Sequence, residues 1–189
     1  MKINGWIYAL MIASLGWAAC DDDDNNNDND VDRSLPATDR NFVEQAAMGN
    51  MAEVNFGQLA VTKGSDSLVR AFGQHMVTEH TTAQDELKEI ADDFNNVTWP
   101  TELDSAHREI REQLETLEGY SFDSLYMSTQ VMDHEKTIDL FETEISQGEE
   151  QRVESYATKY LPHIQEHYEQ ADSIRTVITD MQNNAANGN

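Results

Sequence analysis

One ionisable side chain interrupts each of four apolar helical stripes in this chain, and together the four could bind a metal ion. They are Glu53, His80, His134 and His167. A polar group that is buried without a partner costs about 1–3 kcal/mol, so four of them in apolar seams must find partners. One carboxylate and three imidazoles are a plausible ligand set for zinc, iron, copper or manganese. The pattern therefore predicts a metal site in a helical core.

Nearby residues could complete or support this site. His163 precedes His167 by four residues, a spacing that places two imidazoles on one helix face, so it is a candidate additional ligand. An acidic residue also directly precedes each of the three core histidines, about 100° away around its helix. Such carboxylates can accept hydrogen bonds from ligands on neighbouring helices. The predicted supporting acids are these three, Glu79, Asp133 and Glu166, together with Asp123, which does not precede a histidine.

The same four side chains have two other interpretations. A buried hydrogen-bonded layer of Glu and His can fix the register of the helices without any metal, and histidines at the rim of a bundle can simply be solvated. At a rise of about 1.5 Å per residue, the four residues spread over roughly one helical turn, which is wide for a single ion. Pro162 falls inside the last predicted helix, and a kink there would change the height of His167. The metal site and the hydrogen-bonded layer are therefore close alternatives.

Helical periodicity dominates from Asp39 onward and predicts an all-α domain. The predicted helices cover residues 39–62, 66–95, 101–118, 121–147 and 149–182. The expected capping residues, in helix order, are Thr38 and Asp39, then Ser65 or Asp66, then a capping box from Thr101 to Asp104. Short links join the first pair and the last pair of long helices into antiparallel hairpins. We therefore expect an up-down four-helix bundle with one extra short helix between the pairs.

The segment before this bundle has a different composition. Lys2, an apolar run and the pair Ala18–Ala19 before Cys20 resemble a bacterial lipoprotein signal, which implies a signal peptide over residues 1–19 and lipid on Cys20. The apolar run is about fourteen residues long, whereas a bilayer-spanning helix needs about 20. A plain cleaved signal with an unmodified thiol is the alternative. Residues 20–38 are expected to be a disordered acidic tether, and residues 183–189 a disordered tail.

The chain is strongly acidic, with 36 Asp and Glu, 12 Lys and Arg and a net charge of −24. Phosphate backbones are bound by clustered Lys and Arg, so nucleic acid is not an expected partner. Such a charge attracts cations and basic envelope proteins, and the lipid would supply the contact with a membrane. The single Cys offers no disulfide framework. The oligomeric state is left open.

Spaced motifs run through the whole helical region: Ala46-Ala47-x-Gly49-x-x-x-Glu53, Phe72-x-x-x-Met76-x-x-Glu79-His80, Phe122-Asp123-x-x-Tyr126, Asp133-His134 and Leu161-Pro162-x-x-x-x-His167. In these motifs the chain resembles the bacterial domain-of-unknown-function family DUF4142, over about residues 39–180. The resemblance implies a ferritin-like fold and an outer-membrane location, but no established activity. Di-iron sites of ferritin-like proteins use Glu-x-x-His pairs. Here the residues three before each core histidine are Val77, Val131 and Ile164, so a di-iron oxidase is not expected.

Three functions compete on this evidence. The leading one is a lipid-anchored envelope protein that binds a transition metal through Glu53 and the three histidines. The alternatives are a structural or interaction module of the outer membrane or cell surface without metal, and a metal-dependent oxidoreductase. No phosphate loop, dinucleotide fingerprint or nucleophile elbow is present in the sequence, so an enzyme is less favoured than a binding protein. The expected location is the outer membrane, on its periplasmic or its outer face.

Overall fold

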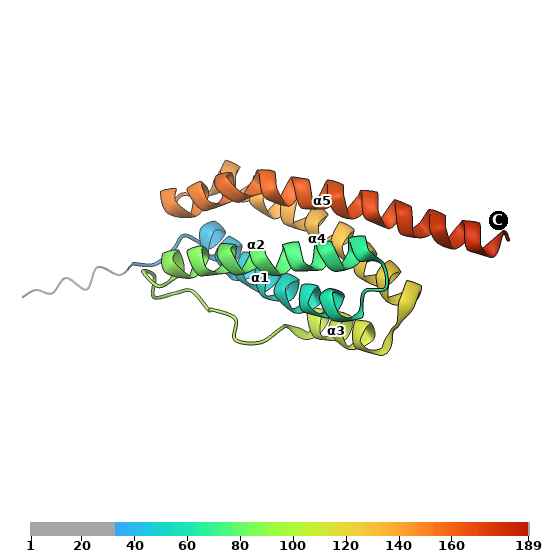
Figure 1. Ribbon diagram of the computed structural model, residues 1–189. Coiled ribbons are helices and arrows are strands. Elements are labelled where there is room, and N and C mark those ends of the chain that lie inside the picture. The colour runs from blue at the N-terminus through green and yellow to red at the C-terminus, as the bar shows by residue number, and fades with distance from the viewer. Residues whose placement is uncertain (1–32, 189) are drawn as a thin grey trace, which may run out of the picture. The chain divides into compact units, whose positions relative to one another are not determined.

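The computed structural model describes residues 33–188, and every regular element among them is an α-helix (Figure 1). The helices are α1 (Ala37–Lys63), α2 (Ser67–Ala91), α3 (Ser105–Thr116), α4 (Gly119–Gln147) and α5 (Gln151–Ala186). The predicted all-α fold, with four long helices and one short one, is confirmed. The predicted signal peptide, Cys20 and most of the acidic tether lie outside the described residues. Within the described part of the chain, no helix is both long enough and apolar enough to cross a bilayer.

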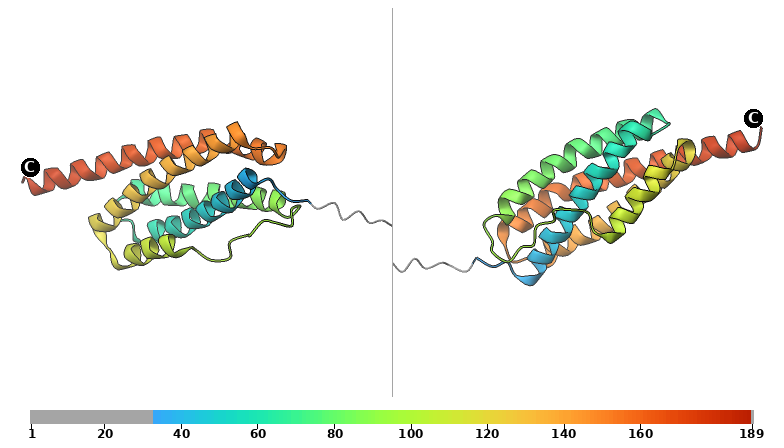
Figure 2. Two further views of the ribbon diagram at one scale, coloured as in Figure 1. Left: turned by 180° about the vertical axis from the view of Figure 1, so that it is seen from behind. Right: turned by 90° about the horizontal axis from the view of Figure 1, so that it is seen from below.

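Two antiparallel hairpins make up the bundle, α1 with α2 and α4 with α5 (Figure 1, Figure 2). α1 also packs against α4, and α2 packs against α5, so side chains from all four long helices can meet in the core. After α2 the chain runs back along the outside of the bundle to α3, which lies beside α1 and α4. The short helix is therefore part of the connection between the two hairpins, as predicted.

Two carboxylates at helix starts show how the hairpin turns are held. Asp66 caps α2, because its side chain accepts the backbone N–H of Leu68 at 2.7 Å, which confirms one of the two predicted caps. Asp39 is predicted to cap α1, but it does not cap this helix. It is buried in the first turn and accepts the backbone N–H groups of Glu149 and Glu150 at 3.1 and 2.7 Å. Asp39 therefore holds the turn between α4 and α5.

The ends of α2 and α3 also differ from the predicted ones. Asp104, and not Thr101, is the cap of α3, because its side chain accepts the backbone N–H of His107 at 2.9 Å. α2 ends before its predicted limit, since the side chain of Asn96 bonds both backbone groups of Leu35 at 2.8 and 3.0 Å. These contacts tie the segment after α2 to the start of α1 and prevent it from continuing as a helix.

α5 continues through most of the segment that the sequence suggests as a disordered tail, ending at Ala186. The reason is local, because residues 183–186 contain neither Gly nor Pro, and a positive φ comes only after the end of α5, at Gly188 with +72°. The end of α5 extends beyond the other helices in Figure 1.

A polar layer divides the core of the bundle into two apolar clusters. The first cluster includes Phe56, Phe72, Met76 and Tyr126. The second includes Phe42, Ala83, Leu87 and Phe141. Along α2, Met76 of the first cluster and Ala83 of the second flank His80, and His134 on α4 and His167 on α5 likewise lie between members of the two clusters. The apolar packing on both sides thus fixes the height of each polar side chain.

Candidate metal centre

Three histidines from three helices meet in the polar layer. His80 lies on α2, His134 on α4 and His167 on α5, and they are 4%, 2% and 2% exposed. One ring nitrogen from each lies within 4.8 Å of the others. The ring centroids are 5.8, 5.5 and 5.4 Å apart. Three imidazoles bound tetrahedrally to one zinc ion at about 2.0–2.1 Å would have centroids about 5.2 Å apart, so the rings are arranged much like ligands of one ion.

Asn50 determines which nitrogen of His80 faces the centre. The hydroxyl of Tyr156 donates to the carbonyl oxygen of Ala83 at 3.2 Å, so it accepts the hydrogen bond from Asn50 Nδ2 at 3.2 Å. The amide oxygen of Asn50 is then the atom that lies 2.8 Å from His80 Nδ1. Because that oxygen can only accept, Nδ1 of His80 carries the proton and Nε2 carries the lone pair.

The other two histidines are oriented in the same way by acceptors outside the centre. Nδ1 of His134 donates to the backbone carbonyl of Gln130 at 2.9 Å. Nε2 of His167 donates to Glu79 Oε2 at 3.1 Å. The pKa of Glu79 is lowered, although burial acts against this, by the hydrogen bond from His75 and by the nearby His167, so its carboxylate is an ionised acceptor. Each imidazole therefore has one N–H bonded outward and one lone pair left.

These lone pairs have no hydrogen-bond partner among the described residues. The atoms are His80 Nε2, His134 Nε2 and His167 Nδ1, and all three are buried. Three acceptors cannot bond one another, because each of them needs a donor. A cation in the centre would satisfy all three at once, and an outward N–H···O bond on every ring is typical of metal-bound histidine.

Burial keeps the three imidazoles neutral. Burial, and to a smaller extent the nearby His134 and His167, holds the pKa of His80 well below its usual range. Burial lowers the pKa of His134 to about 4, with a further contribution from His167. Burial also lowers the pKa of His167 to about 4, although the Glu79 carboxylate acts in the opposite direction. Since neutral imidazole is the form that binds metals, the centre can accept an ion at neutral pH without losing protons.

Glu53, on α1, lies beside His134 but is not one of the converging groups. Its Oε1 lies 3.9 Å from His134 Nδ1, and its buried Oε2 has no hydrogen-bond partner among the described residues. Burial raises the pKa of Glu53 to about 8, against an opposing effect of the Gln130 side chain. A carboxyl group that keeps its proton at pH 7 is a poor metal ligand. We therefore place Glu53 beside the ligand set, whereas the sequence alone places it within the set.

Glu53 and Glu144 should give the metal-free protein a characteristic pH dependence. Burial, together with the nearby carboxylate of Asp39, raises the pKa of Glu144 to about 8 as well. Between about pH 7 and 8, both carboxyls are ionised in the unfolded chain but largely protonated in the folded one. The free energy of unfolding is therefore expected to fall as pH rises through this range, by about 1 kcal/mol per group. Urea denaturation at the two pH values measures it.

The Glu53→Gln variant is the control for this dependence. It should lose about half of the fall, because one of the two contributing carboxyls has been removed. The three buried histidines are neutral in the folded state and mostly neutral in the unfolded state over this range, so they contribute little. A wild-type stability that rises between pH 7 and 8 would contradict the assignment of protonated carboxyls.

A cavity of about 290 Å³ reaches the centre from the side of α3. Its lining includes His80, His134 and Glu53 from the core, and Asp133 and Lys136 nearer the surface. This volume is far larger than the space that one water molecule needs. An ion held by three histidines would therefore keep a coordination position that a small ligand can reach.

The other predicted site residues lie around the centre rather than in it. His163 is 49% exposed, and its Nδ1 lies 3.4 Å from Glu79 Oε2. Asp133 lines the large cavity, and its carboxylate pairs with Lys136 at 3.2 Å. Glu166 is exposed on α5. Among the predicted supporting acids, Glu79 alone has a described hydrogen bond to one of the three core histidines.

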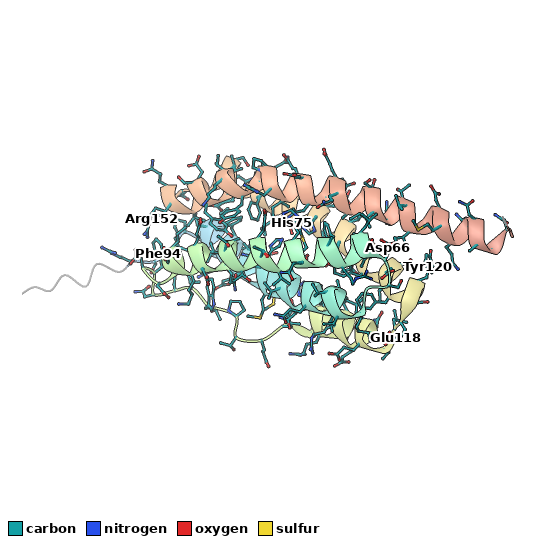
Figure 3. All side chains as sticks on the ribbon, in the orientation of Figure 1. Asp66, His75, Phe94, Glu118, Tyr120 and Arg152 are labelled. Atoms are coloured by element: carbon teal, nitrogen blue, oxygen red, sulfur yellow. The ribbon has the colours of Figure 1, made fainter. Side chains whose placement is uncertain are left out.

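Asp123 is predicted from the sequence to support a histidine of the centre, but it has a different structural role. Its carboxylate accepts the backbone N–H groups of Ser65 and Asp66, both at 2.9 Å, and the hydroxyl of Ser65. Figure 3 shows Asp66 at one end of the bundle and His75 near its middle. Asp123 precedes His134 by about three helical turns on α4, which explains the separation. Its prediction as a supporting acid is corrected, because it holds the turn between α1 and α2.

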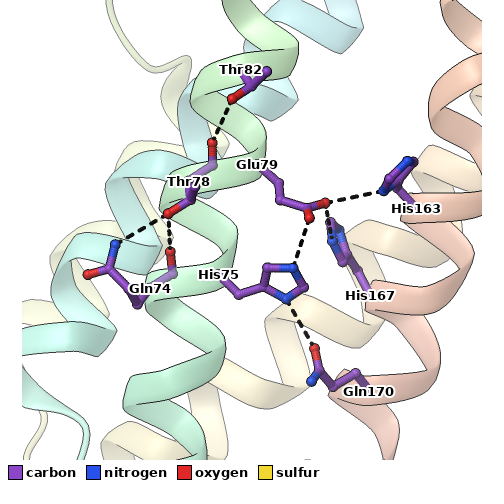
Figure 4. A network of polar contacts seen from close by, with 8 residues as sticks. All are labelled: Gln74, His75, Thr78, Glu79, Thr82, His163, His167 and Gln170. Carbon is purple, nitrogen blue, oxygen red and sulfur yellow. Dashed lines mark hydrogen bonds and ion pairs between the residues drawn. The ribbon is translucent and has the colours of Figure 1, made fainter.

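His75 belongs to the surroundings of the centre, although the sequence suggests it only as a surface partner of Glu79 and not as a site residue. Its ring centroid lies 5.1 Å from that of His167, and its Nε2 lies 3.0 Å from Glu79 Oε1 (Figure 4). The one available signal is the spacing His75-x-x-x-Glu79, which places both side chains on one face of α2. That spacing does not reveal that α5 brings His167 to the same place.

Comparison with known proteins supports the fold. Residues 26–174 match the family described as "Domain of unknown function (DUF4142)". A comparison with curated proteins finds no match. A solved DUF305 fragment from Deinococcus radiodurans is similar with a TM-score of 0.66 and 8% identity, over 76% of this chain and 98% of that one. A putative secreted DUF305 protein from Streptomyces coelicolor is similar with a TM-score of 0.57 and 13% identity, over 76% of this chain and 91% of that one. At these identities the similarity concerns the helical fold alone.

Proposed function

The chain belongs to DUF4142, a family of unknown function, and we propose that its bundle binds one transition-metal ion through His80, His134 and His167. Three buried lone pairs that face one another without a donor carry this proposal. The competing function is a structural layer held by hydrogen bonds. It would leave three buried acceptors unsatisfied, at a cost of about 1–3 kcal/mol each.

The ligand set indicates which metals fit. Imidazole nitrogens suit zinc, copper, iron and nickel, whereas manganese and magnesium prefer carboxylate and water oxygens. All three converging atoms are nitrogens, and the nearest buried carboxyl, Glu53, is held protonated by its raised pKa. We therefore expect a first-row ion such as zinc or copper. The accessible fourth position would be filled by water or by a small ligand from the large cavity.

Titration of the purified, metal-free chain with Co²⁺ tests this function. The protein must carry no histidine tag, because a tag would bind the ion itself. Cobalt held by three nitrogens and one small ligand is four-coordinate and absorbs strongly in the visible range, so the absorption is expected to saturate at one equivalent. A protein that is folded by circular dichroism and yet develops no visible band would contradict the proposal.

We also propose that the protein acts in the cell envelope as a metal buffer. The support is the resemblance of residues 1–20 to a lipoprotein signal and a net charge of −24, which concentrates cations around the domain. A lipid on Cys20 would anchor the chain to a membrane, and the outer membrane is the proposed one. Cell fractionation tests the anchor, since a Cys20→Ser variant should leave the membrane fraction, and its retention there would contradict the lipid.

A further inference from the structure

A second group of metal-binding side chains lies at the surface, directly outside the three buried histidines (Figure 4). His75 and Glu79 project from α2, and His163 projects toward them from α5. The Glu79 carboxylate lies 3.0 Å from His75 Nε2 and 3.4 Å from His163 Nδ1. The side chains of His75, Glu79 and His163 are 36%, 34% and 49% exposed. A dissolved ion can therefore reach this outer group and keep part of its water shell there.

His167 connects the outer group to the buried centre. Its Nε2 lies 3.1 Å from Glu79 Oε2, and its Nδ1 is one of the three inward lone pairs. Ligand atoms of His75, Glu79 and His167 all lie within 4.8 Å of one another. A single imidazole ring thus separates an ion bound at the surface from an ion bound in the core.

A small cavity of about 10 Å³ also joins the two groups. Its lining includes Glu79 and His163 on the outer side, and His80 and His167 on the inner side. Such a volume holds about one water molecule, which is enough space for a first-row ion that has shed most of its water. The larger cavity on the side of α3 also reaches the centre, but its lining contains only His80 among these four residues.

Building on the proposed metal centre, we propose that His75, Glu79 and His163 form an entry site that captures a divalent first-row metal ion and passes it to the buried histidines. The Glu79 carboxylate contacts both imidazoles, so it can bind the ion together with either of them, and imidazole and carboxylate are suitable ligands for zinc, copper or cobalt. The ion takes the place of the hydrogen bonds between the imidazoles and Glu79, and the displaced ring protons move to the opposite ring nitrogens. Exchange of ligands at His167 then carries the ion inward, after which Glu79 again accepts the N–H of His167.

Loading kinetics test the entry site, with Co²⁺ as the probe and stopped-flow detection of its visible absorption in the purified chain. The double variant His75→Gln/His163→Gln is expected to load about tenfold more slowly, because the ion is no longer captured at the mouth of the passage. Its equilibrium Kd for Co²⁺ at the buried centre should remain that of the wild type. His107→Gln is the matched control, since His107 lines the larger cavity on the side of α3. This variant should load at the wild-type rate.

Three results would overturn the entry site. Unchanged loading in the double variant would show that the outer group captures nothing. Slow loading in His107→Gln instead would assign entry to the cavity on the side of α3. A weakened equilibrium Kd in the double variant would make the outer histidines ligands of the buried ion. By contrast, a wild-type chain that binds no Co²⁺ at equilibrium would overturn the metal centre itself, so the two failures are distinguishable.

Discussion

Replacement of His134 by Gln is expected to weaken metal binding by about 100-fold or more. Loss of a group that merely orients a ligand typically costs 10–100-fold in affinity, and loss of a ligand should cost at least as much. Gln retains much of the volume of His and an amide that can reach the carbonyl of Gln130, so the core should stay packed. Equilibrium titration with Co²⁺, with circular dichroism as the check on folding, measures the effect.

Two further variants make this result specific. His80→Gln should behave like His134→Gln, because both side chains contribute one lone pair to the same ion. His163→Gln should keep the wild-type Kd at equilibrium, since this half-exposed side chain lies outside the converging nitrogens. Equal affinity in His134→Gln and in wild type would show that the ion, if one binds, is held elsewhere.

Metal should also stabilise the folded protein substantially. A ligand that binds only the folded state at about 1,000 times its Kd adds about 4 kcal/mol to the free energy of unfolding. For a chain of this size, that corresponds to a rise in Tm of about 8–16 °C. Differential scanning calorimetry of the zinc-loaded chain, before and after removal of the ion with a chelator, measures the difference.

The same experiment separates the metal centre from a purely structural polar layer. A hydrogen-bonded layer needs no ion, so chelation would leave Tm unchanged. In the metal-centre account, the zinc-dependent rise in Tm should shrink to about a third or less in His134→Gln, because a 100-fold weaker Kd leaves the same zinc concentration at only about 10 times Kd. A large zinc-dependent shift that persists in His134→Gln would assign the stabilisation to another site, with the outer group of His75, Glu79 and His163 as the first to examine.

The helices could be predicted from the sequence, because apolar stripes at helical spacing are a local signal. Their ends were harder to predict, since several carboxylates and amides there have partners far along the chain. Asp39 resembles an N-cap in sequence, yet it binds the backbone of Glu149 and Glu150. The side chain of Asn96 bonds the backbone of Leu35, and α2 ends before this residue. Local spacing carries no information about such contacts.

The candidate site was predicted in its components but not in its geometry. Counting residues from the hairpin turns spreads the four polar side chains over about one helical turn, yet one nitrogen each from His80, His134 and His167 lies within 4.8 Å of the others. The count treats the helices as parallel rods with level ends, and it ignores the reach of the side chains. The orienting contact between Asn50 and His80 joins two helices, so no spacing within one helix could reveal it.

Elemental analysis by mass spectrometry is the most direct test of the metal centre. The chain should be expressed without an affinity tag in medium supplemented with first-row metals, purified without chelators, and compared with His134→Gln prepared in the same way. We predict close to one equivalent of a first-row transition metal in the wild-type protein and little in the variant. A well-folded wild-type protein that contains no such metal would contradict the account, and the three histidines would then be a structural layer of the bundle.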